Sequence, residues 1–179
     1  RLLAAAPDDN SRKNLLALRE AIKENNILQE QQQQLEMQST LRTAVYMLET
    51  IRNYASRRNS LQSQYESMKR DSRSAKGETL ATLRRIMNTA EQGLEQFRTG
   101  IDRSLSFYRT RVEEAARLDK DDFERALAGL LKDYAGEDLF NENMRRNAEL
   151  LRQHVQNERA GKLPAGRAML QEILETRSK

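Results

Sequence analysis

Apolar residues recur at alternating spacings of three and four positions over residues 80–101, the most regular hydrophobic pattern in the chain. A helix that packs along another helix needs an apolar residue about every 3.5 positions. The pattern therefore predicts one long helix with a single apolar seam, which slips by one residue beyond position 101 and then continues. The seam consists of Leu80, Leu83, Met87, Ala90, Leu94, Phe97 and Ile101.

A second apolar periodicity lies earlier in the chain, in a stretch without proline or glycine. Residues 11–69 form either one helix or two helices broken near Asn25 or the glutamine-rich residues 29–34. One helix is favoured, because no residue in the stretch stops a helix. Its early face carries Leu15, Leu18 and Ile22, with Ile27 or Leu28. We expect this helix to turn near residues 70–78 and to pack against the seam through Leu41, Val45, Leu48 and Ile51.

Three shorter helices are predicted after residue 118. Asp119 and Asp138 are suitable N-caps, Gly136 and Gly161 are suitable C-terminal stops, and Pro164 suits the start of the last helix. The sequence thus predicts an all-α protein built as one folded unit. Residues 1–118 form an elongated antiparallel bundle or coiled-coil hairpin, and residues 119–179 cap or extend it.

The composition agrees with a helical interaction protein. Hydrophobic residues make up 37% of the chain and charged residues 32%, which suits a narrow helical seam better than a layered α/β core. The bias of basic residues toward arginine is typical of a GC-rich bacterial genome. Residues 2–6 resemble the end of a signal peptide, but the remnant of a helix end is the favoured interpretation. A cytoplasmic location is slightly favoured over a periplasmic one, and the compartment otherwise stays open.

The sequence shows no arrangement of residues that is typical of an enzyme active site. It has no cysteine and a single histidine, His154, so thiol chemistry is excluded and a solvated or structural role is favoured for the histidine. The run Asp119–Asp122 lacks the glycine and the distal glutamate of a calcium loop and is interpreted as a helix cap. We therefore expect no enzymatic activity, no catalytic, cofactor-binding or metal-binding residues, and no cofactor.

The formal charge of +4 is unevenly distributed. Basic residues dominate from residue 42 to residue 76, and acidic residues dominate from residue 119 to residue 138. Opposed charges of this kind steer one helix or subunit onto another, and this is favoured over binding of nucleic acid or an acidic membrane. The candidate anion-binding residues are Arg52, Arg57, Arg58, Arg70 and Arg73.

These features lead to a non-enzymatic helical protein–protein interaction or scaffold module that forms a homo-oligomer, binds another protein, or does both. One alternative is the ligand-sensing ectodomain of a bacterial membrane receptor. That alternative predicts both chain ends at one end of the bundle and a pocket between helices. A second alternative is a basic helical surface that binds nucleic acid or an acidic membrane.

Overall fold

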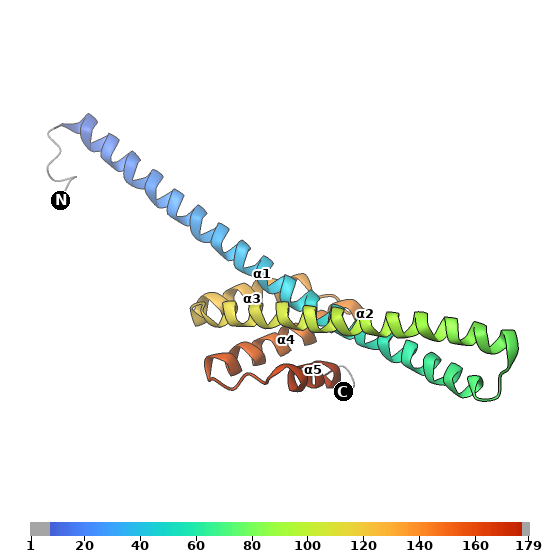
Figure 1. Ribbon diagram of the computed structural model, residues 1–179. Helices are drawn as coiled ribbons and strands as arrows, with labels where there is room; N and C mark the ends of the chain where they lie inside the picture. Colours follow the sequence, from blue (N-terminus) through green and yellow to red (C-terminus); the bar gives the residue numbers. More distant parts are fainter. Residues whose placement is uncertain (1–7, 177–179) are drawn as a thin grey trace.

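The computed structural model describes residues 8–176, which form five helices and no strand. Two long helices are followed by three shorter ones, which pack around the end of the long pair that lies away from its turn (Figure 1). The all-α prediction is confirmed. The predicted helix-end remnant at residues 2–6 lies outside the described residues. The helices are α1 (Asp9–Ser72), α2 (Gly77–Ala116), α3 (Lys120–Asp133), α4 (Leu139–Arg159) and α5 (Gly166–Glu175).

α1 is one continuous helix of 64 residues. At 1.5 Å per residue it is about 96 Å long. Its N-cap is Asp8, whose carboxylate accepts a hydrogen bond of 2.6 Å from the main-chain N–H of Ser11. The preference for one helix over two is therefore confirmed, since neither the asparagines nor the glutamines interrupt it.

α2 returns antiparallel to α1 after a short turn that ends at Gly77, which has a φ of +62°. The register is visible where the helices touch. Tyr54 lies against Phe97, with ring centroids 6.3 Å apart, and the Tyr65 hydroxyl donates to Glu91 at 2.7 Å. Residues equally distant from the turn therefore face each other, as in any antiparallel hairpin.

This register corrects the predicted pairing of the two apolar sets. The predicted partner residues, Leu41 to Ile51, are buried, but they join a cluster with Leu105 and Val112 of α2, beyond the seam. The seam lies opposite the part of α1 that begins near Tyr54 and runs toward the turn, and most of its side chains are only half-buried. The prediction paired two apolar patterns by their regularity, whereas the position of the turn determines which residues meet.

The three shorter helices confirm most of the predicted boundaries. The side chains of Asp119 and Asp138 cap α3 and α4, and Gly161 adopts a φ of +69° just after α4 ends. The predicted role of Gly136 is wrong, because α3 ends three residues earlier, at Asp133. The guanidinium group of Arg145 donates to the carbonyls that follow this helix end, and no left-handed glycine is needed there.

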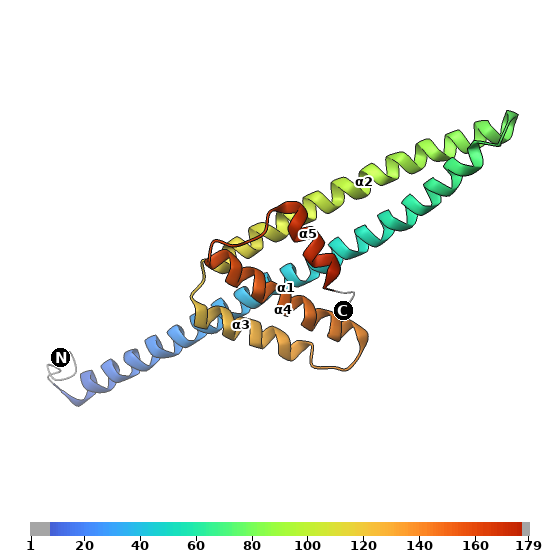
Figure 2. The same cartoon turned by 90° about the horizontal axis from the view of Figure 1, so that it is seen from below.

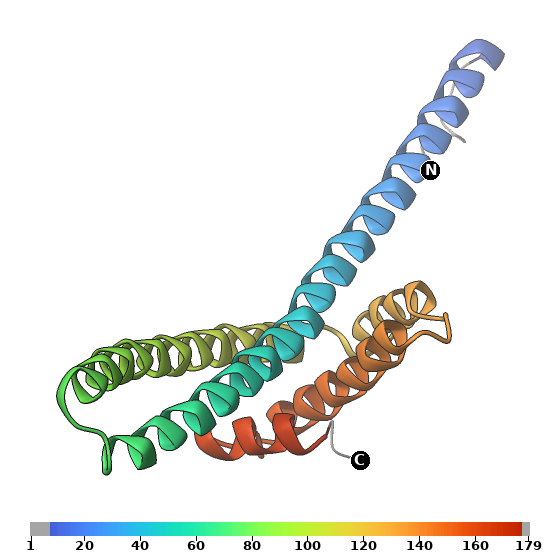
Figure 3. The same ribbon diagram turned by 90° about the vertical axis from the view of Figure 1, so that its right-hand side faces the viewer.

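A single hydrophobic cluster joins all five helices. It lies where α3, α4 and α5 cover the middle of α1 and the C-terminal part of α2, as two further views show (Figures 2 and 3). Two parts of the long helices extend beyond this cluster in opposite directions. One is residues 9–36 of α1, called the arm below, and the other is the turn end of the hairpin, residues 56–92, called the tip.

Candidate functional site

The arm is a solvated helix that projects from the bundle (Figures 1 and 3). Every side chain from residue 16 to residue 33 is exposed, and the 28 residues of the arm reach about 42 Å. The overhang follows from the unequal lengths of the hairpin helices, because α1 has 64 residues and α2 has 40. The signal of this overhang in the sequence is the long stretch without proline or glycine that precedes the turn.

The arm exposes large apolar side chains. Six of them are 45–66% accessible, whereas Leu41, Val45, Leu48 and Ile51 in the middle of the same helix are buried. Grouped exposed apolar side chains mark interaction surfaces more often than isolated ones do. Of the predicted early apolar face, Leu15 is half-buried and the other members are exposed in a single chain. The six are Leu16, Leu18, Ile22, Ile27, Leu28 and Leu35.

Charge on the arm is divided along its length. Residues 9–23 carry four basic and two acidic side chains, whereas residues 24–36 carry three acidic and no basic ones. The opposite charges of Arg19 and Glu30 lie eleven positions apart, too far for the pairing that residues three or four apart make on one helix. The arm is thus basic toward its N-terminal end and acidic toward the bundle.

A shallow hollow opens where the arm joins the bundle. Its walls come from α1, from the C-terminal end of α2 and from the segment just after α2, and they combine apolar and acidic groups. Glu114 in its wall also pairs with Arg111 at 2.9 Å. The lining residues are Gln33, Glu36, Met37, Thr40, Glu114, Ala115 and Leu118.

The tip carries the other charged surface. Residues 56–92 hold eight basic and four acidic side chains. Of the predicted anion-binding residues, Arg57, Arg70 and Arg73 are exposed and Arg58 is half-buried. They spread over about 24 Å along the helix and do not converge on one point.

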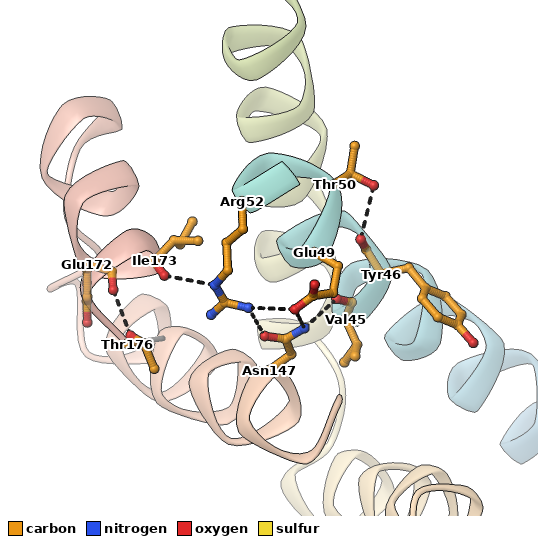
Figure 4. A network of polar contacts seen from close by, with 9 residues as sticks. All are labelled: Val45, Tyr46, Glu49, Thr50, Arg52, Asn147, Glu172, Ile173 and Thr176. Carbon is orange, nitrogen blue, oxygen red and sulfur yellow. Dashed lines mark hydrogen bonds and ion pairs between the residues drawn. The ribbon is translucent and has the colours of Figure 1, made fainter. Parts of the chain in front are cut away.

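Arg52 does not belong to that surface, which corrects its predicted role. It is 5% exposed and lies between α1, α4 and α5 (Figure 4). Its Nε donates to the carbonyl of Ile173 at 3.0 Å, and its terminal nitrogen donates to Glu49 at 3.2 Å and to Asn147. Asn147 in turn donates to the carbonyl of Val45 at 3.2 Å. Arg52 thus connects three helices and is not accessible to a ligand.

His154 has a structural role, one of the two favoured for it in the sequence. Its ring is fully buried, and its Nδ1 shares a hydrogen bond of 2.6 Å with the Tyr108 hydroxyl. Burial lowers the pKa of His154, and a carboxylate oxygen of Glu172, 3.3 Å from Nε2, opposes that shift. Burial also raises the pKa of Tyr108 far above its ordinary value. The pair is a neutral contact between α2 and α4, closed to a substrate.

Three further properties of the described residues concern the alternative functions. Among residues 8–176, no three histidine, cysteine or carboxylate side chains gather as metal ligands would. Over the same residues, no helix combines the length and the apolar character needed to span a bilayer. α1 begins at the far end of the arm, whereas α5 ends beside the middle of the bundle (Figure 1). The receptor alternative predicts that both chain ends lie at one end of the bundle. The start of α1 and the end of α5 are not arranged in that way.

Comparisons of this chain with known protein families, with curated proteins and with solved structures gave no significant match. The function proposed below therefore depends on the geometry and charge of the arm and the tip.

Proposed function

We propose that this protein is a non-enzymatic, self-associating helical interaction module, and that the arm is its contact element. The observation that supports this most directly is the exposure of six large apolar side chains on one continuous projecting helix. Burial of such side chains in a partner is favourable by about 1.5–3 kcal/mol each when it is complete. A helix of this kind gains most from lying along another helix.

The rest of the molecule supports a scaffold role. The buried cluster joins all five helices and fixes the direction in which the arm leaves the bundle. The one histidine lies in the core, so it contributes to the fold and does not face solvent. The arm then projects away from the short helices and the tip, so a second copy of the chain can lie along it.

The experiment compares two matched substitutions by sedimentation velocity over a concentration series. Ile22 in the arm and Ile86 in the tip are 53% and 47% exposed, and both lie inside a helix. We expect the unmodified chain to associate as its concentration rises, and Ile22→Lys to raise the dissociation constant about tenfold or more. Ile86→Lys introduces the same charge at the other end and should leave association unchanged.

Circular dichroism checks that both variants keep the helical content of the unmodified chain. A chain that stays monomeric at every concentration would contradict the proposal. Equal loss of association in both variants would also contradict it, because the contact would then not belong to the arm.

A second candidate is anion binding by the tip, supported by its excess of basic side chains. Titration against DNA and against vesicles of acidic lipid at two salt concentrations tests it, since phosphate contacts weaken steeply with salt. Arg57→Glu together with Arg73→Glu should reduce such binding. Binding that is absent, or equal at both salt concentrations, argues against this candidate.

A further inference from the structure

We infer that the arm binds the arm of a second copy of this chain in antiparallel orientation, so that two bundles lie at opposite ends of a shared two-helix rod. This inference rests on the proposed self-association and adds the contact surface and its direction. A row of positions on one face of the arm supplies the surface, and the division of charge along the arm selects the direction.

One face of the arm carries positions spaced alternately by four and three residues, called the arm row. The three most exposed apolar side chains of the arm, Leu18, Leu28 and Leu35, all lie in it, at 57%, 63% and 66% exposed. Alternation of this kind keeps a row in contact along two helices that wrap around each other. The other members are alanine or neutral amides, so no charge lies in the row. The arm row consists of Asn14, Leu18, Ala21, Asn25, Leu28, Gln32 and Leu35.

The arm row also has the symmetry that an antiparallel pair needs. In the proposed register, the residue numbers of two facing positions add up to 46. Every member of the arm row from residue 14 to residue 32 then faces a member of the arm row of the second copy. Leu18 then lies level with Leu28 of the second copy, and Ala21 lies level with Asn25 of the second copy. A two-fold contact of this kind uses the same surface on both copies and is closed, so association stops at a dimer.

The division of charge selects this direction over the parallel one. Residues 9–23 have net charge +2 and residues 24–36 have net charge −3, and the change of sign falls at the centre of the arm row. Antiparallel overlap places the basic part of each arm along the acidic part of the other. Parallel overlap places like charges together in both parts, which is unfavourable.

The hollow at the base of the arm continues the same contact. Leu15, Ile22 and Glu36 belong to a line of positions seven residues apart that runs beside the arm row, and Glu36 lines the hollow. In this register, Arg12 of the second copy lies within one turn of helix of Glu36 as measured along the axis of the rod. The hollow also holds the carboxylate of Glu114 and apolar groups. A basic and apolar helix end therefore meets an acidic and apolar surface.

The absence of cysteine allows a direct test of direction in the full chain. Asn14→Cys and Gln32→Cys introduce thiols at two exposed positions of the arm row that add up to 46. These positions lie about 27 Å apart on one arm. A bismaleimide that spans much less than this separation is added above the concentration at which the chain dimerises. We expect neither variant to cross-link with itself, and a mixture of the two to give a covalent dimer.

Ala21→Cys is the positive control, because it should cross-link in either orientation. Its two thiols lie only about 6 Å apart along the axis of an antiparallel rod, and at the same level in a parallel rod. Self-cross-linking of Asn14→Cys and of Gln32→Cys, without a mixed product, would show parallel arms and overturn the inference. If dimers form but Ala21→Cys does not cross-link them, the inference is also overturned. The chain would then self-associate through another surface. A monomeric chain would remove both the inference and the proposed function.

Charge reversal tests the physical cause. Reversal of the basic part alone places acidic parts together, and we expect the dissociation constant at low salt to rise about tenfold or more. Reversal of both parts in one chain restores complementarity and should restore the affinity. An affinity unchanged by the first reversal, or not recovered by the second, would overturn the inference. The two sets are Arg12→Glu, Lys13→Glu and Arg19→Glu, and Glu24→Lys, Glu30→Lys and Glu36→Lys.

Discussion

Arginine side chains satisfy main-chain carbonyls at the C-terminal ends of three different helices. Arg52 donates to the carbonyl of Ile173 in α5. Arg145 donates to the carbonyl of Tyr134 just after α3, and Arg159 donates to that of the last residue of α2. The last carbonyls of a helix have no partner within it and carry partial negative charge, so a cation there is favourable. Part of the arginine content therefore holds the short helices on the long pair.

We expect Arg52→Ala to lower the free energy of unfolding by about 3 kcal/mol, because it leaves buried polar groups of α4 and α5 without their donor. Arg57→Ala, five residues along the same helix at an exposed position, should change it by less than about 0.5 kcal/mol. Urea unfolding followed by circular dichroism measures both. Similar values for the two variants would contradict the role assigned to Arg52.

The buried His154 predicts a dependence of stability on pH. Burial lowers its pKa in the folded protein, so below about pH 6.5 the unfolded chain binds more protons than the folded one. Stability should therefore fall as the pH falls through and below that value. The groups facing the ring are Tyr108, Glu172 and Arg109, and of these Glu172 favours the charged ring.

Urea unfolding between about pH 7.5 and about pH 5.5 measures this effect. We expect the unmodified protein to lose more stability over this range than His154→Gln, which keeps an acceptor for the Tyr108 hydroxyl. The difference between the two slopes isolates the histidine from the surface carboxylates. Equal slopes, or a steeper loss in the variant, would show that His154 is not held neutral by the fold.

At the scale of elements, the two parts of the hairpin should differ in their sensitivity to truncation. Leu48 is fully buried among several helices, whereas Leu94 is half-buried between only two. We expect Leu48→Ala to cost about 2–5 kcal/mol of unfolding free energy and Leu94→Ala less than half as much. Chemical denaturation of the two variants gives the comparison. Equal losses of unfolding free energy would show that Leu94 is packed as densely as Leu48 in the central cluster.

The sequence was sufficient to predict the helices, but not which residues of different helices pack together. The absence of proline and glycine in α1, and the caps Asp119 and Asp138, are local signals, and the structure confirms them. Which residues face Leu48 depends on the position of the turn and on α3, α4 and α5, none of which a hydrophobic period encodes. For the same reason the sequence placed Arg52 on a surface, although three helices enclose it.

At the scale of the whole molecule, α1 passes through two environments. Its middle lies in the cluster that joins all five helices, whereas the arm is a single solvated helix. Isolated helices are only marginally stable in water, even when their sequences favour helix formation. The arm should therefore open far more often than residues 41–55, unless a second arm covers it.

Hydrogen exchange at two protein concentrations tests this expectation. Below the concentration of association, we expect arm amides to exchange much faster than those of residues 41–55, which open only with the whole bundle. Above it, protection of the arm should rise, while protection of the tip stays the same because the tip remains solvated. Ile22→Lys should abolish the rise and leave the central cluster as protected as before. An arm whose protection does not depend on concentration would show that it has no partner in a second copy.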